Sequence, residues 1–297
     1  MRHLNFHPIH LNPRALFARH CLMPIALLAG ACGHALAQDA AAGGPPPGWV
    51  GPPPGWSGGV LAGAGAAPDF EGSRTQRGQP VLGFAMTYRN QAMGSLEMGS
   101  RGLAWTPVQG PDAKLTIGTS LDPGRVDNGD KKLTVMGYRP GNERLQGLGE
   151  IDAAPVLSVG GAFKLAGLPL AAELRHAFGS HDGTQLDLGL KAPWKIGSHV
   201  DLSIAPAITW ADRRYMQAFF GVTSAQAAAS RYAAYDARSG LKSAQLTVDM
   251  DMALSRWWHV NATVQAKRLL QDAADSPITE KTTQVSGMVA VLRQFQL

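Results

Sequence analysis

The chain has 297 residues, of which 45% are hydrophobic and 16% are charged, whereas ordinary soluble domains have roughly 25% charged residues. Its formal net charge is +5, but removal of the three arginines of an N-terminal targeting segment leaves 24 basic against 22 acidic residues. The high isoelectric point therefore indicates no nucleic-acid partner. Both cysteines, Cys21 and Cys32, lie in the same segment, which excludes disulfides and thiolate metal sites from the remaining chain.

Residues 1–37 have the pattern of a cleaved signal peptide. Three arginines precede an apolar stretch at 22–31, and Ala35-Leu36-Ala37 forms a cleavage site. We therefore expect the mature chain to start at Gln38. The apolar stretch is too short for a transmembrane helix. An alternative is lipoprotein processing at Cys32, because residues 28–32 resemble a lipobox.

Residues 38–56 form a low-complexity leader rich in Ala, Gly and Pro, with the pentapeptide PPPGW at 45–49 and again at 52–56. Proline triplets favour extended polyproline II structure. The leader is interpreted as a semi-rigid periplasmic tether. The alternative is a docking peptide in which Trp49 and Trp56 contact a partner.

Residues 57–297 alternate between apolar and polar positions, as strands with one apolar face do. In the clearest example, Leu186, Leu188 and Leu190 alternate with Asp187 and Gly189. The pattern predicts twelve strands, an even number as in bacterial single-chain barrels. They are expected at 57–66, 80–89, 94–105, 113–121, 132–139, 155–165, 169–178, 184–194, 199–210, 241–254, 258–270 and 283–296.

A soluble β-sandwich would also alternate, but three features favour an all-β, antiparallel, up-and-down transmembrane β-barrel. A signal peptide comes first, and the expected connections tend to alternate between short and long. Tryptophans lie near strand ends, as in interfacial girdles. With a periplasmic N-terminus, this topology places Trp105 and Trp210 at the outer rim and Trp194, Trp257 and Trp258 at the inner rim. We expect a location in the bacterial outer membrane, in contact with its lipid.

The polar faces of the expected strands carry charges of both signs, which should face the lumen because charge facing lipid is costly. They either line a narrow aqueous path or form a salt-bridged, largely closed interior, and we favour the closed interior. The candidate lumen charges are Glu173, Arg175, Asp187, Lys191, Asp249, Asp251 and Lys267.

The longest connection, 212–240, is expected to form a short helix over the outer mouth. Thr223 and Gln226 have the spacing of a capping box, and alanine-rich sequence follows. Charge pairing is expected to clamp the outer loops, with acidic residues of the first outer loop as partners of the arginines. The candidate clamp residues are Asp69, Glu71, Arg213, Arg214 and Asp236.

The tripeptide Ser180-His181-Asp182 contains the residue types of a hydrolase triad, but consecutive side chains diverge and a triad depends on geometry. Flanking glycines indicate a hairpin turn in solvent. The histidines show no metal-ligand spacing. We expect no catalytic residue, cofactor or metal, and therefore no enzyme.

Several longer motifs resemble those of the MltA-interacting protein/OmpV family of outer-membrane proteins, over about 56–297. They are APDFEGS at 67–73, GLG at 147–149 with DAAP at 152–155, WADRRYMQAFFGVT at 210–223, continuing through SAQA at 224–227 to YDA at 235–237, and LLQDAADSPI at 269–278.

The resemblance implies an outer-membrane barrel. It further implies a scaffold that joins a periplasmic lytic transglycosylase to a cell-wall synthase, a penicillin-binding protein. The alternative is a porin-like channel for small solutes, linked to permeability or osmotic response.

Overall fold

A computed structural model describes residues 55–90, 92–110, 113–127, 131–134, 137–165 and 168–296. The predicted signal peptide, its cleavage site and Trp49 lie outside these residues, as does all of the leader before Gly55.

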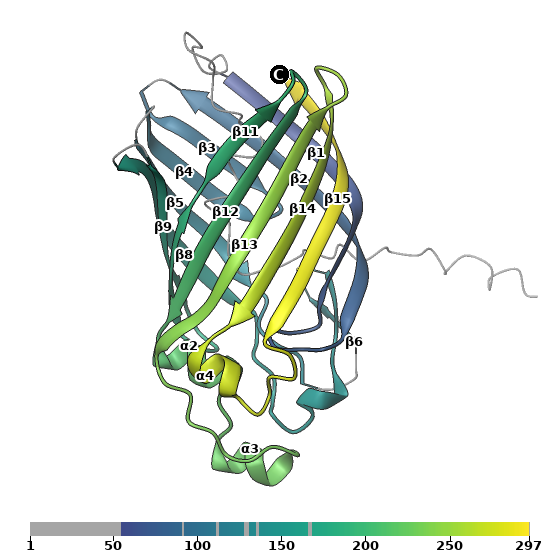
Figure 1. The fold of residues 1–297 in the computed structure, drawn as a ribbon, viewed down its shortest axis with the longest axis vertical. Coiled ribbons are helices and arrows are strands. Elements are labelled where there is room, and N and C mark those ends of the chain that lie inside the picture. The colour runs from purple at the N-terminus through teal and green to yellow at the C-terminus, as the bar shows by residue number, and fades with distance from the viewer. Residues whose placement is uncertain are drawn as a thin grey trace, which may run out of the picture.

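The fold is a closed antiparallel β-barrel, as the alternating pattern predicted (Figure 1). Its strands are β1 Gly55–Pro68, β2 Gln76–Asn90, β3 Gly94–Gly99, β4 Gly102–Gln109, β5 Ala113–Asp122, β8 Ala154–Leu165, β9 Leu168–Ala177, β10 Thr184–Leu190, β11 Ala192–Ile196, β12 Val200–Ala211, β13 Gly240–Ala253, β14 Trp258–Leu269 and β15 Thr283–Gln296.

These thirteen segments make twelve barrel strands. β10 and β11 pair one after the other with the same strand, β12, so they form one interrupted strand. Each strand otherwise pairs with its neighbours along the sheet, and β1 pairs with β15 to close the barrel. At this seam Gly63 lies so close to the backbone of Val289 that any side chain there would collide with it.

Two of the expected strands are wrong in detail, although the total of twelve is confirmed. The stretch 94–105 turns back at Ser100 and Arg101 and supplies two short strands, β3 and β4. The stretch 132–139 lies outside the barrel sheet. It forms a separate hairpin of β6 (Lys131–Thr134) and β7 (Gly137–Pro140).

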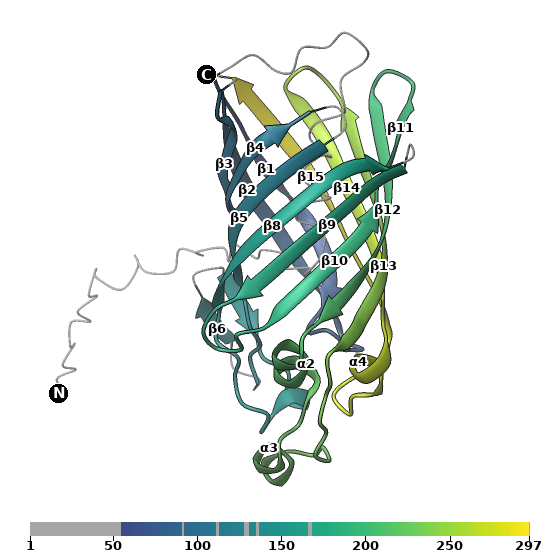
Figure 2. The ribbon, with the colours of Figure 1, turned by 90° about the vertical axis from the view of Figure 1, so that its left-hand side faces the viewer.

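The two ends of the barrel differ. At one end the connections are short, as at 197–199 and 254–257, and both the start of β1 and the C-terminal end of β15 lie there. The other end carries the connections 69–75, 123–153, 178–183, 212–239 and 270–282, with helices α2 (Arg213–Phe220), α3 (Ser224–Ala229) and α4 (Gln271–Asp275) and the 3-10 helix η2 (Glu143–Leu145) (Figures 1 and 2). Bacterial barrels have short periplasmic turns and long extracellular loops, which makes the helical end the outer one.

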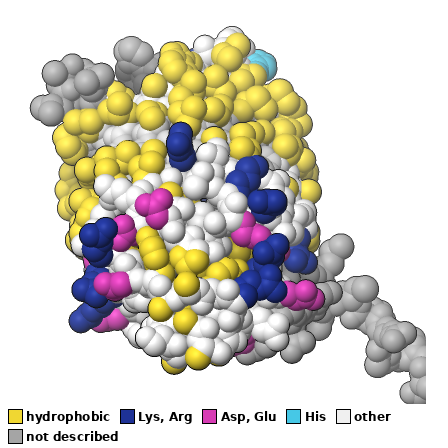
Figure 3. Space-filling model, turned by 60° about the horizontal axis from the view of Figure 1, so that its bottom comes forward, with side chains coloured by type: hydrophobic (Ala, Val, Ile, Leu, Met, Phe, Trp, Pro, Cys, Tyr) yellow, Lys and Arg dark blue, Asp and Glu magenta, His cyan; other side chains and the backbone are white. Residues whose placement is uncertain are grey.

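The outer wall of the barrel is apolar. Large hydrophobic side chains such as Phe84, Leu174, Leu188 and Val289 are exposed on it, and charged side chains gather instead over the outer end (Figure 3). A closed barrel with such a belt suits a bilayer, because its first and last strands pair with each other and leave no open end of the sheet. The barrel is of the outer-membrane type.

Tryptophans mark both rims of this belt. Trp194, Trp257 and Trp258 lie at the inner rim, and Trp210 lies near the outer end of β12. The outer position expected for Trp105 is wrong. Because the chain reverses at Ser100–Arg101, Trp105 lies on the inner half, and its Nε1 donates to the carbonyl of Met93 in an inner turn at 2.9 Å. Within the described residues, no helix has the length and apolar character needed to cross a membrane.

Candidate functional site at the capped outer mouth

Polar side chains of the neighbouring strands β9 and β10 pair with one another on the inner face of the barrel wall. Glu173 and Asp187 lie in register on neighbouring strands, as do Arg175 and Gln185. The Arg175 guanidinium donates through Nε and Nη2 to Oδ2 of Asp187 at 3.0 and 2.6 Å, and it lies 4.0 Å from the Glu173 carboxylate. Thr209 of β12 donates to the other oxygen of Asp187 at 2.6 Å. All are buried, so this candidate set forms a connected network inside the barrel.

The acidic pair of β13 has a different environment. Thr263 donates to Asp249 at 2.7 Å. Asp251, nearer the inner end, interacts with His259 at 2.8 Å and accepts a hydrogen bond from Asn261. No lysine or arginine forms an ion pair with either aspartate among the residues the structure describes. The inner half of this wall is therefore acidic.

Glu71 joins the outer loops to the lumen. It lies in the 69–75 connection, and its carboxylate accepts hydrogen bonds from Lys267 at 2.7 Å and from Lys242 at 3.1 and 3.3 Å. Burial alone would raise the pKa of Glu71, but the charges and hydrogen bonds of Lys242 and Lys267 lower it from 4.5 to about 2. The carboxylate therefore stays ionised beneath the outer mouth.

Lys242 was not among the expected lumen charges, because its position in strict alternation faces outward. The register between β12 and β13 shifts at Thr209/Trp210, which pair with Ser243 and Leu241 and leave Lys242 as the extra residue. Such a bulge re-aims a side chain. Here the ammonium group turns inward, contacts Gln185 at 2.8 Å and lies 4.7 Å from the centre of the Tyr215 ring. A bulge leaves no clear signal in the sequence.

The expected clamp residues all form ion pairs, but these are separate pairs and do not form one connected clamp. Arg213 pairs with Asp236 at 2.8 Å, whereas Arg214 pairs with Asp182. Asp69 bonds Arg77 at 3.0 Å. The expected pairing of Asp69 and Glu71 with Arg213 and Arg214 is therefore wrong. Glu71 instead reaches the barrel lysines.

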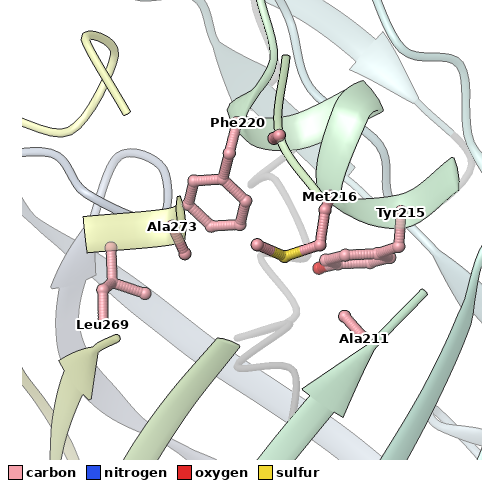
Figure 4. Packing of buried hydrophobic residues seen from close by; sticks show 7 residues of the cluster. Ala211, Tyr215, Met216, Phe220, Leu269 and Ala273 are labelled. Carbon is pink, nitrogen blue, oxygen red and sulfur yellow. The ribbon is translucent and has the colours of Figure 1, made fainter. Parts of the chain in front are cut away.

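A hydrophobic cluster holds the long 212–239 connection over the mouth (Figure 4). α2 starts at Asp212, whose side chain accepts a hydrogen bond from the Tyr215 amide at 2.8 Å, as expected of an N-cap. Tyr215, Met216 and Phe220 of α2 then pack with Leu269 and with alanines of β12, 236–238 and α4. α3 begins with the predicted capping box of Thr223 and Gln226.

A second cluster joins the 123–153 connection to 212–239 and 270–282. Leu145, Leu148, Val222 and Ile278 are buried together. Arg125 donates to the carbonyl of Phe219 at 2.9 Å, and its burial lowers the pKa of its guanidinium to about 10. Together the outer connections form one packed unit, called the cap here: residues 69–75, 123–127, 141–153, 178–183, 212–239 and 270–282.

His181 belongs to the cap interior, so the expected solvent position of this histidine is wrong. Its side chain has no exposed surface, and Nε2 lies 3.5 Å from Oδ2 of Asp122. The rings of Tyr215 and Phe219 pack edge-on against it at 5.7 and 5.1 Å. Ser180 points elsewhere and donates to the carbonyl of Asp152 at 2.7 Å. The three residues 180–182 therefore form no hydrolase triad.

The remaining candidates lie apart from this site. Lys191 sits at the interruption between β10 and β11, where its amide donates to the carbonyl of Pro169 at 3.1 Å. Trp56 lies in β1, opposite Tyr88 of β2, with the two rings 5.1 Å apart. It is thus part of the barrel wall, and the leader ends before it. Among the described residues, no three metal-ligating side chains lie close enough to hold an ion.

Some solved structures are similar in fold, all at low identity. The COG4313 outer membrane channel from Pseudomonas putida F1 aligns with 10% identity and a TM-score of 0.41 over 85% of this chain and 100% of that chain. The translocator domain of the autotransporter NalP from Neisseria meningitidis aligns with 10% identity and a TM-score of 0.39 over 88% and 92%. OmpT, an outer membrane protein of Vibrio cholerae, aligns with 8% identity and a TM-score of 0.36 over 72% and 64%, so the chain spans less than two thirds of that structure.

These likenesses carry no argument about function. A search of curated proteins finds no match in sequence. The family model described as MltA-interacting protein MipA matches residues 60–295, which is nearly the whole barrel and its cap. The chain belongs to the MltA-interacting protein MipA family.

Proposed function

We propose that the protein is a non-enzymatic outer-membrane anchor that holds cell-wall enzymes at the inner face of the outer membrane. The observation that carries this proposal is the closed outer mouth. The cap packs around two hydrophobic clusters, and Glu71 ties it to Lys242 and Lys267 inside the barrel. A barrel closed in this way is suited to presenting its periplasmic side to a partner.

The partners proposed are a periplasmic lytic transglycosylase and a penicillin-binding protein. The family description names an interaction with MltA, and the earlier resemblance implies that a hydrolase and a synthase of murein meet on the same scaffold. Both enzymes work in the space that the short-turn end of the barrel faces.

The leader is the proposed docking segment. β1 begins at the inner rim with Gly55, so residues 38–54 join the barrel on the side that faces the cell wall. Trp56 pairs with Tyr88 in the wall, which leaves Trp49 as the aromatic candidate for partner contact. Aromatic side chains are favoured anchors at protein interfaces.

A pull-down with purified transglycosylase and penicillin-binding protein tests the proposal. The full mature chain should retain both enzymes, and chains lacking 38–54 or carrying Trp49→Ala should lose them. Trp210→Ala, a tryptophan change at the opposite rim, is the matched control and should retain them. If all four proteins retain the enzymes equally, the leader has no role and the barrel itself binds. Failure of the full chain to retain either enzyme would refute the anchor.

A gated small-solute channel is the second candidate, favoured by the acidic inner wall. Asp249 and Asp251 accept hydrogen bonds from Thr263 and Asn261, so their negative charge would attract cations from the inner end. Conductance in a planar bilayer separates the candidates. An anchor predicts a silent, correctly folded barrel, and a channel predicts cation-selective steps from the wild-type protein.

A further inference from the structure

Two arginines and two tryptophans meet at the inner rim of the barrel. Arg256 and Trp257 lie in the turn between β13 and β14, and Trp258 is the first residue of β14. Arg293 lies directly across from Trp258 on β15, near the C-terminal end of that strand. Figure 1 shows this turn beside the end of β15. The pairing of β14 with β15 therefore gathers the four side chains at one point of the rim.

The tryptophan rings hold the two guanidinium groups. The Arg256 Cζ lies 4.2 Å from the centre of the Trp257 ring. The Arg293 Cζ lies 5.6 Å from the centre of the same ring and 5.3 Å from that of Trp258. These distances are within the range of cation–π attraction. The amides of both tryptophans donate to Ser255 Oγ at 3.2 and 3.1 Å, so the turn fixes the rings that support the two charges.

Neither arginine has an acidic partner within the described part of the chain. Arg293 donates from Nη1 to the backbone carbonyl of Gln294 at 3.2 Å, which leaves its charge uncompensated, and no ion pair there includes Arg256. Lys195, at the same end of the barrel, is instead neutralised by Asp201 at 2.7 Å. The two arginines therefore form a local excess of positive charge.

Arg293 continues the lipid-facing row of side chains on β15. The outward valines of this strand, Val285, Val289 and Val291, are exposed, and Arg293 occupies the next outward position toward the inner rim. Trp258, level with it on β14, is exposed as well. Tryptophans mark the depth of the lipid head groups, and an arginine at this depth can direct its guanidinium toward them. The site therefore faces the head groups of the inner leaflet.

We propose that this rim site binds the phosphate of a glycerophospholipid of the inner leaflet. The guanidinium groups of Arg256 and Arg293 donate hydrogen bonds to the phosphate oxygens, as arginines do in charge-assisted pairs. The acyl chains run along the valines of β15 toward the middle of the bilayer. Charge complementarity selects a phosphate, and the outward position of Arg293 beside the apolar belt favours a lipid over an acidic protein segment. The site does not depend on the anchor role proposed above.

Native mass spectrometry of the full mature chain in detergent tests this proposal with dioleoyl phosphatidylglycerol as the probe. Wild-type protein should bind one phosphatidylglycerol tightly and bind dioleoylglycerol, which has the same acyl chains but no phosphate, much more weakly. Arg293→Gln should weaken phosphatidylglycerol binding about tenfold, as expected for loss of a charge-assisted hydrogen bond, and Arg293→Lys should retain part of the affinity. Arg268→Gln, a change of an exposed arginine near the outer end of β14, is the matched control and should bind as the wild type does.

Equal phosphatidylglycerol affinity of the Arg293→Gln and Arg268→Gln proteins would overturn the proposal. Equal binding of phosphatidylglycerol and dioleoylglycerol by the wild type would also overturn it, without any substitution. Displacement of the lipid by glycerol phosphate at matched concentration would show a plain anion site and not a lipid site. Loss of the cell-wall enzymes from Arg293→Gln in a pull-down, with unchanged lipid affinity, would assign the surface to a protein partner. The heat-induced gel shift of each variant confirms that its barrel is folded before binding is compared.

Discussion

Replacement of Glu71 by glutamine should open the cap while leaving the barrel folded. The glutamine keeps the size of the side chain but removes the negative charge that Lys242 and Lys267 share. The Lys242 side chain has no exposed surface and that of Lys267 is 9% exposed. Neither ammonium group can therefore recover its hydration without movement of the cap.

The magnitude follows from the pKa of Glu71. Its fall from 4.5 to about 2 corresponds to about 3 kcal/mol of stabilisation, at about 1.4 kcal/mol for each pH unit. Because the pKa is lowered in the folded protein, this contribution is fully present above pH 4.5 and is lost as the pH falls toward 2. The side chain of Glu71 is 20% exposed, so solvent screening reduces the effect only modestly.

Hydrogen exchange of cap amides measures the effect directly. The amides of Val222 and Tyr235 bond each other's carbonyls across the 212–239 connection at 2.8 Å, and their exchange reports cap opening. A cost of about 3 kcal/mol predicts exchange about 100-fold faster in Glu71→Gln at neutral pH. The difference between the variant and the wild type should shrink as the pH falls from 4.5 toward 2.

Asp236→Asn is the matched control, because Asp236 lies in the same cap but pairs with Arg213, and the two side chains are 62% and 66% exposed. An exposed pair contributes about 1 kcal/mol or less, so exchange should change by less than tenfold. The double change Glu71→Gln with Lys242→Met should restore much of the protection, since it removes the unpaired charge. Unchanged exchange in Glu71→Gln at neutral pH would refute the reasoning.

Three further changes separate the barrel from its cap. Arg175→Met leaves Asp187 without its bidentate partner and should destabilise the barrel by about 3–5 kcal/mol, measured by urea unfolding in lipid vesicles; a change under 1 kcal/mol would contradict it. Met216→Ala removes a fully buried side chain from the cap and should cost about 2–5 kcal/mol, seen as faster proteolysis within 212–239 with the heat-induced gel shift unchanged. Arg213→Ala breaks an exposed pair with Asp236 and should cost about 1 kcal/mol or less in the same proteolysis assay; a larger loss would show that the clamp does hold the cap.

The barrel could be predicted because the alternation of apolar and polar residues along a strand is a local property of the sequence. The interleaving of Leu186, Leu188 and Leu190 with Asp187 is visible in the sequence, and the structure places those residues on opposite faces of β10. The reversal at Ser100–Arg101 was missed because apolar positions continue at period two on both sides of it. Gly99 and Gly102 bracket the turn, and Gly102 has a positive φ of 122°, so two glycines three residues apart were the available signal.

The centre of the cap could not be read from the sequence. Glu71 meets Lys242 and Lys267 across 171 and 196 residues, and the contact depends on a bulge that no local pattern shows. The burial of His181 likewise depends on α2. Gly183 allows α2 to pack closely against this turn, since a Cβ at position 183 would lie 2.7 Å from the Tyr215 Cβ. In the sequence, however, Gly183 looks like the glycine of any hairpin turn.

The seam between β1 and β15 sets the order of events when the protein is made. It joins Ser57 to Gln296, so it connects the first and last strands of the barrel, and such distant pairings form late because a long loop must close first. The barrel cannot close until its last strand has been made. Until then the sheet has two unpaired edges, and unpaired edges are prone to pair with other chains.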